Sequence, residues 1–394
     1  MELSLYHIRK RAQEAEGVVI VGAGHRGKDM FTYLKNNGIV VKSFFDNNTL
    51  IGTGINNIEV LKPHKIEENG ILYIIAVESV EMCNELHAQL IKLGVEDNDI
   101  VAYYRQNYDF IKNLDKKYYK EAIDNMYYDY FGRKMDWENP STYNEIINWE
   151  KLNIRDERRT RLADKLLVKD WVREQIGEKY ITKLYGSWND AEDIDFNALP
   201  NQFVLKLNNG SGRNIVVKDK NLIDRTKVCR QLNEWKNFNF AYKALELHYR
   251  DINPKIICEE YLDGVADNVY DYNIYCFQGE PMYIWCIKGS HKPDCKASFY
   301  NKDWKMMPFV YRYPKDNIVA PKPEKLEEML NLCRILSKGF KHVRVDWYNL
   351  PDGRVLFGEM TFSTCAGLRR FEPEEYDNIF ANLIKGNSGE GFNA

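Results

Sequence analysis

The chain of 394 residues is 44% hydrophobic and 29% charged, which is typical of a globular protein long enough for two or three cores. Its formal net charge of −3 excludes an overall basic surface for nucleic acid. No apolar run approaches the length that spans a bilayer, and the first residues predict an amphipathic helix without the core of a signal peptide, so we expect a cytoplasmic protein. The 8 cysteines form no CxxC pair and are expected to be reduced, mostly buried thiols.

Residues 17–47 predict a buried strand, a glycine-rich turn, a helix and a second strand that ends in an acid. Gly22, Gly24 and Gly27 match G-x-G-x-x-G, a pattern that brings the backbone close to a pyrophosphate, and Asp46 follows at about the spacing of a ribose-binding carboxylate. With further strands expected at 71–77 and 100–103 and a helix at 80–93, the segment predicts a Rossmann-like domain over residues 1–105.

The ligand of this first domain stays open at the level of sequence. The glycine pattern permits NAD, but no catalytic Tyr-x-x-x-Lys or dehydrogenase-type domain follows it. The glycine turn with His25 also resembles the N-terminal nucleotide-sugar-binding domain of sugar O-acyltransferases, and a purely structural domain is the third alternative.

Residues 106–130 are polar and helical in pattern and are interpreted as a connector. The segment WENPSTYNEIINWE then predicts a capped helix, because Ser141 or Thr142 can cap it and Glu145 lies three residues after Thr142. We expect both tryptophans of this segment, Trp137 and Trp149, to have packing roles.

The segment FVLKLNNGSGR, residues 203–213, predicts a strand that runs into a loop of glycine and small polar residues. Such a loop lets backbone N–H groups close over nucleotide phosphates, while Lys206 supplies a point charge to the same oxygens. A plain hairpin would show the same pattern.

The segment HVRVDWYNLPDGRVLFGEMTFSTCAG predicts a hairpin with strands at 343–348 and 354–362 around a Pro-Asp-Gly turn. Alternation along the strands places Arg344, Asp346 and Tyr348 on one face and Glu359 and Thr361 on one face of the partner strand. Two carboxylates that meet on one face repel each other unless a cation lies between them, and their hard oxygens suit Mg²⁺. The alternative is a solvated face on which Arg344 neutralises the acids.

Together these segments resemble the ATP-grasp enzymes, and the chain from about residue 118 resembles the TupA-like branch associated with bacterial surface-polysaccharide gene clusters. The resemblance lies in the order of WENPSTYNEIINWE, RLADK, FVLKLNNGSG, LHYRDINPKIICEEYLDG, YDYNIYCFQGEP, RVDWY and FGEMTF. The resemblance implies an α+β ATP-grasp ligase domain at 131–394. With the Rossmann-like parallel-sheet domain expected at 1–105 and the helical connector at 106–130, we expect an α/β chain.

The resemblance also implies roles for single residues, with ATP and Mg²⁺ as cofactors. The residues implied in nucleotide binding are Lys165, Lys206, Asn209, Gly210, Ser211, Gly212, Glu259, Tyr261, Leu262 and Asp271. Glu259, Tyr261 and Leu262 would line the adenine pocket, and Asp271 would bind the ribose.

Arg344 and Lys206 are implied as catalytic residues that neutralise phosphate charge. Asp346, Glu359 and Thr361 are implied as magnesium ligands, an arrangement that also resembles D-alanine–D-alanine ligases. Thr361 replaces the usual Asn, and Asn273 stands where relatives usually carry a lysine.

The activity implied is an ATP-dependent carboxylate–amine ligase that forms an amide through an acyl phosphate, with a uronic acid, free or linked to a nucleotide, and a small amine as substrates. The alternatives are an ATP-dependent kinase or glycosyl-modifying transferase and a non-catalytic scaffold. The identity of the substrates and the oligomeric state stay open.

Overall fold

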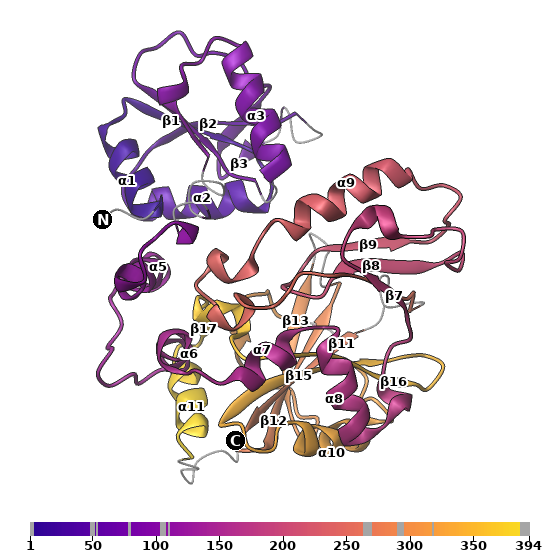
Figure 1. Ribbon diagram of the computed structural model, residues 1–394. Coiled ribbons are helices and arrows are strands. Elements are labelled where there is room, and N and C mark those ends of the chain that lie inside the picture. Colours follow the sequence, from indigo (N-terminus) through magenta and orange to yellow (C-terminus); the bar gives the residue numbers. More distant parts are fainter. Residues whose placement is uncertain are drawn as a thin grey trace. The chain divides into compact units, whose positions relative to one another are not determined.

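The computed structural model describes residues 4–47, 52, 54–77, 80–102, 108, 111–262, 270–289, 295–316 and 319–386. The chain divides into two compact units, Met1–Lys134 and Met135–Ala394 (Figure 1). The segment expected as a connector forms helix α5 (Tyr119–Phe131), which belongs to the first unit. None of the helices in the described ranges is both long and apolar enough to cross a bilayer.

The first unit is built on a six-stranded sheet of order β3-β4-β2-β1-β5-β6. Neighbouring strands are parallel except for the antiparallel β3–β4 pair. Its elements besides α5 are α1 (Ser4–Glu14), β1 (Gly17–Val21), α2 (His25–Asn36), β2 (Val41–Phe45), β3 (Gly54–Ile55), β4 (Ile58–Leu61), β5 (Ile71–Ile75), α3 (Val80–Lys92), β6 (Ile100–Ala102) and the short 3₁₀ turns Asp97–Asp99 and Lys116–Tyr118.

Apolar side chains cover both faces of this sheet. Val18 and Ile20 of β1 lie in one cluster with side chains of α1 and α2, while Val19 and Val21 lie in a second cluster with side chains of α3. Because successive strand residues point to opposite faces, a continuous apolar run is what a sheet covered on both sides requires.

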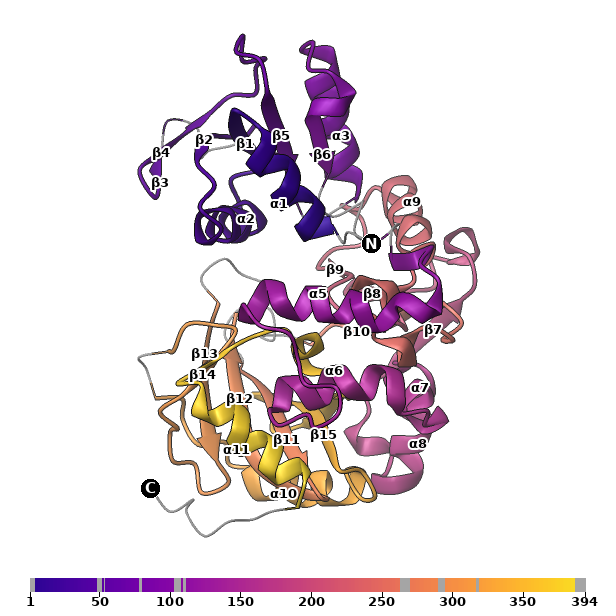
Figure 2. The ribbon, with the colours of Figure 1, turned by 90° about the vertical axis from the view of Figure 1, so that its left-hand side faces the viewer.

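The second unit contains two larger antiparallel sheets, of order β7-β10-β8-β9 and β13-β12-β11-β15-β16, and the small pair β14-β17. Its strands are β7 (Leu184–Trp188), β8 (Phe203–Leu207), β9 (Asn214–Val217), β10 (Ile256–Glu260), β11 (Tyr270–Phe277), β12 (Glu280–Lys288), β13 (Lys296–Asn301), β14 (Val310–Tyr311), β15 (His342–Asn349), β16 (Val355–Thr361) and β17 (Phe371–Glu372). Its α-helices are α6 (Tyr143–Asn153), α7 (Glu157–Ala163), α8 (Leu167–Ile176), α9 (Arg225–Lys236), α10 (Leu326–Leu336) and α11 (Glu375–Ile384). Helices α6 and α11 lie side by side (Figure 2).

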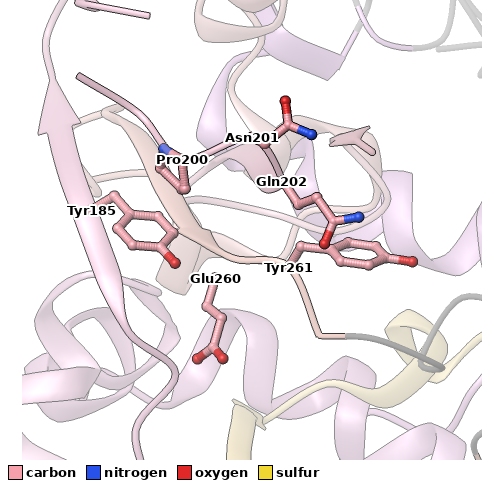
Figure 3. Close-up of a pocket in the computed structure, with 6 residues that line it drawn as sticks. All are labelled: Tyr185, Pro200, Asn201, Gln202, Glu260 and Tyr261. Carbon is pink, nitrogen blue, oxygen red and sulfur yellow. The ribbon is translucent and has the colours of Figure 1, made fainter. Parts of the chain in front are cut away.

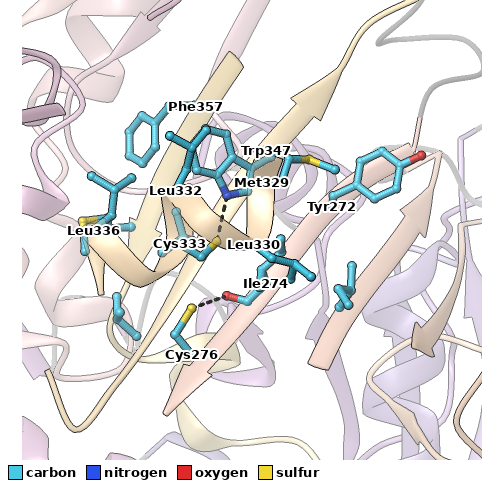
Figure 4. Close-up of a cluster of buried hydrophobic side chains, with 14 of the residues drawn as sticks. Tyr272, Ile274, Cys276, Met329, Leu330, Leu332, Cys333, Leu336, Trp347 and Phe357 are labelled. Atoms are coloured by element: carbon cyan, nitrogen blue, oxygen red, sulfur yellow. Dashed lines mark hydrogen bonds between the residues drawn. The ribbon is translucent and has the colours of Figure 1, made fainter. Parts of the chain in front are cut away.

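Each larger sheet has one face covered by a helix. Helix α9 packs on the apolar face of the four-stranded sheet. Helix α10 packs on the five-stranded sheet, where the Trp347 indole donates a hydrogen bond to Cys333 Sγ at 3.1 Å (Figure 4). On the second face of the five-stranded sheet, side chains of α6 and α11 pack on Tyr275, Trp285 and Phe299. The polar residues of that face lie on β15, β16 and the first part of β11, and these can build a site.

Two local predictions are confirmed. The hairpin has strands β15 and β16 joined by a turn in which the Gly353 amide donates to the Leu350 carbonyl at 3.0 Å. Helix α6 begins with a capping box, in which Thr142 Oγ1 accepts from the Glu145 amide and the Glu145 carboxylate accepts from the Thr142 amide. Lys165 lies in the break between α7 and α8, just before the second helix.

Candidate active site

The face of the five-stranded sheet opposite α10 carries a row of polar residues on β11 and β15. On β11, Asp271 and Asn273 lie opposite Tyr348 and Asp346 of β15. Tyr272 and Ile274, which alternate with them, lie in the cluster under α10. Because successive strand residues point to opposite faces, Asp271, Asn273 and Asp346 lie on the face away from this cluster, which we call the polar floor.

Strand β16 reaches this floor only because it contains a bulge. Arg344 pairs with Thr361, but Trp347 pairs with Phe357, so β16 has one residue more than β15 between these pairs. The backbone at Gly358 lies so close to Asp346 that a Cβ there would be 3.1 Å from the Asp346 carbonyl oxygen. The extra residue turns Phe357 into the core while Glu359 and Thr361 stay on the polar floor.

The charged side chains on this floor form one network. Arg344 donates to both oxygens of Asp346 at 2.7 and 2.6 Å, to Glu359 Oε1 at 3.2 Å and to Thr361 Oγ1 at 3.0 Å. Thr361 Oγ1 donates to Glu359 Oε1 at 2.8 Å, and Lys165 Nζ donates to Glu359 Oε2 at 2.9 Å. The structure thus brings together five of the residues singled out in the sequence, from three separate segments.

The two carboxylates differ in electrostatics although they share Arg344. Burial raises the pKa of Asp346 to about 7, against the opposing effect of Arg344. Burial acts in the same direction on Glu359, but Lys165 and Arg344 outweigh it and lower the pKa of Glu359 to about 2. Asp346 is therefore the carboxylate whose charge is least compensated, and a further cation beside it would be favourable.

The donor set fits Mg²⁺ better than a soft metal. Two carboxylates and a hydroxyl are hard oxygen donors, and Mg²⁺ is usually held by one or two carboxylates together with substrate phosphates. Within the part of the chain that the structure describes, no group of three or more His, Cys, Asp or Glu side chains gathers to form a metal site from protein ligands alone. This arrangement needs ligands from a substrate to complete a coordination shell.

The glycine-rich loop after β8 touches the network through Lys165. The Lys165 ammonium donates to the Gly210 carbonyl at 2.8 Å as well as to Glu359. Gly210 has φ of +80°, and a Cβ there would come within 2.5 Å of the Phe240 ring. Asn209 is 3% exposed, yet neither its amide nitrogen nor its oxygen has a hydrogen-bond partner within the protein. Buried polar atoms without partners are costly, so this side chain is suited to contact a ligand.

Asn208, at the start of the same loop, has a structural role instead. Its side chain donates to Asp164 Oδ2 at 2.9 Å and to the Asn253 carbonyl at 3.1 Å, and its Oδ1 accepts from the Lys255 amide at 2.7 Å. These bonds tie the loop to the segments before α8 and β10. Ser211 is exposed, and a Cβ at Gly212 would meet no atom within 4 Å, so the tip of the loop is open.

Lys206 points away from α9, toward the same side as Glu259. Lys206 Nζ lies 2.5 Å from Glu259 Oε2, and Lys169 Nζ of α8 lies 2.9 Å from Oε1. Burial disfavours the charge on Glu259, but Lys206 and Lys169 outweigh it and lower the pKa of Glu259. The carboxylate expected in the adenine pocket therefore already has two cationic partners.

One of the residues expected around adenine lines a pocket. A pocket of about 400 Å³ is lined by Tyr185, Pro200, Asn201, Gln202, Glu260 and Tyr261 (Figure 3). It includes Tyr261 but not Glu259, and Leu262 packs in an apolar cluster with Leu350 and Leu356. None of the residues of the Arg344 network lines this pocket.

Tyr348 links the acids of both sheets. Burial raises its pKa well above the usual value, and Asp271, Glu359, Glu259 and Asp346 raise it further. All four carboxylates therefore lie near one phenol, although they come from four different strands or strand ends. Asp271, expected to bind ribose, belongs to this group.

Three relevant residues were missed at the level of sequence. Lys169 lies near the start of α8, and no local sequence pattern indicates its pairing with Glu259 of β10. Gly358 is an isolated glycine within a strand pattern, which is a recognised sign of a bulge. Nothing in the sequence marked Tyr348 as the meeting point of the acids.

The glycine turn of the first unit has a different role for each glycine. Gly22 has φ of +104°, and a Cβ at Gly27 would lie 1.9 Å from the Gly22 carbonyl oxygen, so α2 packs directly on the turn. A Cβ at Gly24 would meet nothing within 4 Å. Asp46 Oδ2 accepts from the Ala23 amide at 2.7 Å, so this carboxylate holds the turn in place.

Comparison with known proteins points to one family. A family model described as TupA-like ATP-grasp matches residues 145–385. Among solved structures, the chain is similar to the ATP-grasp ligase PsnB complexed with a phosphomimetic variant of its minimal precursor, Mg and ADP, with 10% identity, a TM-score of 0.33 and coverage of 94% of this chain and 98% of that one.

Two further solved structures are comparably distant. One is L-amino acid ligase from Bacillus licheniformis, with 12% identity, TM-score 0.37 and coverage of 94% and 76%. The other is D-alanine–D-alanine ligase from Bacillus anthracis complexed with ATP, with 13% identity, TM-score 0.34 and coverage of 95% and 99%. These values are too low to argue a substrate.

No curated protein sequence matches the chain. The family match rests on sequence and covers more than half of the chain. The chain belongs to the TupA-like ATP-grasp family.

Proposed function

We propose that the protein is an ADP-forming carboxylate–amine ligase that uses ATP and Mg²⁺ in the synthesis of a capsular or other surface polysaccharide. The observation that carries the proposal is the single network in which Lys165, Arg344, Asp346, Glu359 and Thr361 meet on one sheet face. Cations and acids that alternate in this way match the needs of phosphoryl transfer, which demands positioning and charge neutralisation rather than a protein nucleophile.

The chemistry has two steps. A substrate carboxylate oxygen attacks the γ-phosphorus of ATP, which gives an acyl phosphate and releases ADP. An amine then attacks the acyl carbon, loses a proton and expels phosphate, which leaves an amide. Lys165, Lys206 and Arg344 neutralise the charge of the phosphate oxygens, and the glycine loop excludes water.

Asp346, Glu359 and Thr361 are the residues that would hold Mg²⁺ in this scheme. A bound cation would offset the negative charge of the phosphate oxygens. The raised pKa of Asp346 supports this assignment, because it marks the carboxylate that would gain most from an added cation.

The carboxylate we favour is a uronic acid carried on a nucleotide diphosphate. We assign the first unit as a Rossmann-like domain that holds the nucleotide part. Its parallel sheet, the tight turn at Gly22, the open space at Gly24 and the contact of Gly27 with the turn support this assignment, because they match the three functions of glycine in a dinucleotide-binding turn. The Asp46 carboxylate accepts a hydrogen bond from the Ala23 amide and so stabilises this turn.

The test is Mg²⁺-dependent ADP release from ATP with UDP-glucuronate and a panel of small amines, followed by mass spectrometry of the sugar nucleotide. A ligase releases ADP only when both partners are present and yields the mass of an amide. A product whose mass increases by one phosphate would show that the protein is a kinase and not a ligase. A protein that does not bind MgATP would be a non-catalytic scaffold.

A matched pair of variants on the hairpin connects the activity to the site. Asp346→Asn should lower ADP release by about 10²–10³-fold, as loss of one charge-stabilising group does in other enzymes. Asp352→Asn removes a carboxylate from the exposed hairpin turn, where it pairs with Arg354, and should stay within about twofold of the parent.

A further inference from the structure

Helix α6 buries polar side chains that the proposed chemistry does not use. Asn144 and Asn148 are 0% exposed, and Lys151 is 6% exposed. Buried amides and ammonium groups are unfavourable unless they have partners, so the partners indicate what the helix is for.

The partners of Asn148 lie on either side of it. Its Nδ2 donates to the Gly367 carbonyl at 2.7 Å and to the Asn144 carbonyl at 2.8 Å, while its Oδ1 accepts from Lys151 Nζ at 2.8 Å. The first of these bonds crosses 219 residues of sequence and ends on the segment that follows β16. We call residues 363–368 the left-handed turn.

The left-handed turn is strained. Cys365 and Ala366 have φ of +51° and +55°, and Gly367 follows with φ of +63°. A residue with a Cβ in this region costs about 1–2 kcal/mol, and such conformations persist where the surroundings hold them.

Helix α6 also fits against the left-handed turn sterically. A Cβ at Gly367 would lie 2.8 Å from Asn148 Nδ2, 2.9 Å from Ile147 Cγ2 and 3.0 Å from the Asn144 carbonyl oxygen. There is room for glycine and for nothing larger. The hydrogen bond from Asn148 and the close packing at Gly367 are two independent observations that α6 contacts the left-handed turn.

A second buried contact fixes the start of the turn. Ser363 Oγ donates to Glu246 Oε1 at 2.5 Å. Burial raises the pKa of Glu246 and lowers that of Lys151 to about 8, and each residue counters the shift of the other. Lys151 therefore touches Asn148 and lies close to the acid that holds Ser363.

The left-handed turn contacts the candidate active site through Thr364. Its Oγ1 accepts from Arg344 NH1 at 3.4 Å, and the turn begins two residues after Thr361. Any shift of the turn would move this partner of the guanidinium that the proposed function assigns to phosphoryl transfer.

We propose that Asn148 is a positioning residue, which holds the left-handed turn against α6 and thereby orients Arg344 toward the reacting carboxylate. The role assigned to Arg344 rests on the proposed function, whereas the hold on the turn does not. The segment WENPSTYNEIINWE thus acts on the site from a helix that carries none of the residues assigned to the proposed chemistry.

The first experiment measures hydrogen exchange by mass spectrometry in the full-length protein. Within the turn, the Ala366 amide donates to the Ser363 carbonyl at 2.9 Å and the Leu368 amide donates to the Cys365 carbonyl at 3.1 Å. Asn148→Ala removes about one hydrogen bond's worth of restraint and should raise exchange in this peptide about tenfold. Asn148→Asp, which keeps the size and the contact with Lys151 but loses both donated bonds, should do the same.

The matched control lies on the same helix. Asn153 is exposed, and its Nδ2 donates to the Trp149 carbonyl of its own helix at 2.8 Å. Asn153→Ala should leave exchange in the turn unchanged within twofold. Exchange in Asn148→Ala and Asn148→Asp that equals the parent value would overturn the proposal.

The second experiment separates positioning from folding in the ADP-release assay. Asn148→Ala should lower kcat/KM for the carboxylate about tenfold. The Kd for MgATP should change by less than this, because Lys165 and Lys206, which the proposed function also assigns to the phosphate oxygens, lie on segments that the left-handed turn does not hold. Faster exchange with unchanged kcat and KM would overturn the positioning role. If no carboxylate and amine are consumed, the proposed function fails, while the exchange data still decide whether Asn148 holds the turn.

Discussion

The two glycines of the loop after β8 offer a direct test of the geometry on which the site depends. Both have positive φ, +80° at Gly210 and +79° at Gly212, so alanine at either position meets the same left-handed backbone cost of about 1–2 kcal/mol. They differ in surroundings. A Cβ at Gly210 would lie 2.5 to 3.0 Å from three atoms of Phe240, whereas one at Gly212 would meet nothing.

Rotation of the Phe240 side chain cannot relieve this clash completely, because its own Cβ is one of the three atoms. Overpacking of this kind costs about 1–3 kcal/mol. Gly210→Ala should therefore lower the free energy of unfolding by about 2–5 kcal/mol and Gly212→Ala by only about 1–2 kcal/mol. The same displacement would move the carbonyl that Lys165 binds, so MgATP affinity should fall in Gly210→Ala.

Urea unfolding followed by tryptophan fluorescence measures these changes in the second unit alone, since all 8 tryptophans lie after residue 134. Repeating both substitutions in a Phe240→Ala background isolates the contact. There the excess cost of Gly210→Ala should largely disappear. Equal costs for the two glycines in both backgrounds would refute the assignment of Gly210 to close packing against Phe240.

Three further predictions follow from single residues. Thr361→Val should raise the Mg²⁺ concentration needed for half-maximal activity about tenfold. Thr361→Asn keeps an oxygen donor at this position and should not raise it. Identical shifts in the two variants would show that Thr361 is not a metal ligand. Burial lowers the pKa of His248 to about 3 from its ordinary 6.5. Between these pH values the unfolded chain binds a proton at His248 that the folded chain does not. The free energy of unfolding should therefore fall by about 1.4 kcal/mol per pH unit as the pH drops from about 6 toward 3. His248→Phe should remove that slope in urea unfolding at pH 6, 5 and 4, and an unchanged slope would contradict the burial of a neutral ring. Cys229 and Cys365 are half-buried and the other six cysteines are buried, so a thiol reagent should modify two cysteines rapidly in native protein, and labelling of more than two at once would be inconsistent with the fold.

The secondary structure around the site was predictable because its signals are local. The Pro-Asp-Gly turn fixes the hairpin, and the Thr142–Glu145 capping box marks the start of α6. Strand alternation within the hairpin already brought Arg344 and Asp346 together with Glu359 and Thr361. Lys165 could be added only through the family resemblance, because it lies 194 residues before Glu359 and no local pattern relates such distant positions.

Other features depend on partners that only tertiary structure supplies. Simple alternation predicted a regular hairpin, yet β16 needs one extra residue to keep both Phe357 in the core and Glu359 on the floor. Likewise, the sequence around Asn148 predicts only a capped helix. Nothing near this residue indicates that its side chain will donate a hydrogen bond to the Gly367 carbonyl. Buried polar pairs of this kind are specified jointly by both segments.

The bulge at Gly358 has a consequence for the order in which the site is made. Val355 and Phe357 enter the core on one side of it, and Met360 and Phe362 on the other, so hydrophobic packing alone fixes the register of the whole strand. The packing of these core residues thus fixes the spacing of Asp346 and Glu359, without the need for a bound cation. Unlike a zinc finger, whose fold exists only with its metal, this hairpin is assembled first, and a chelator should strip a cation from it without melting it.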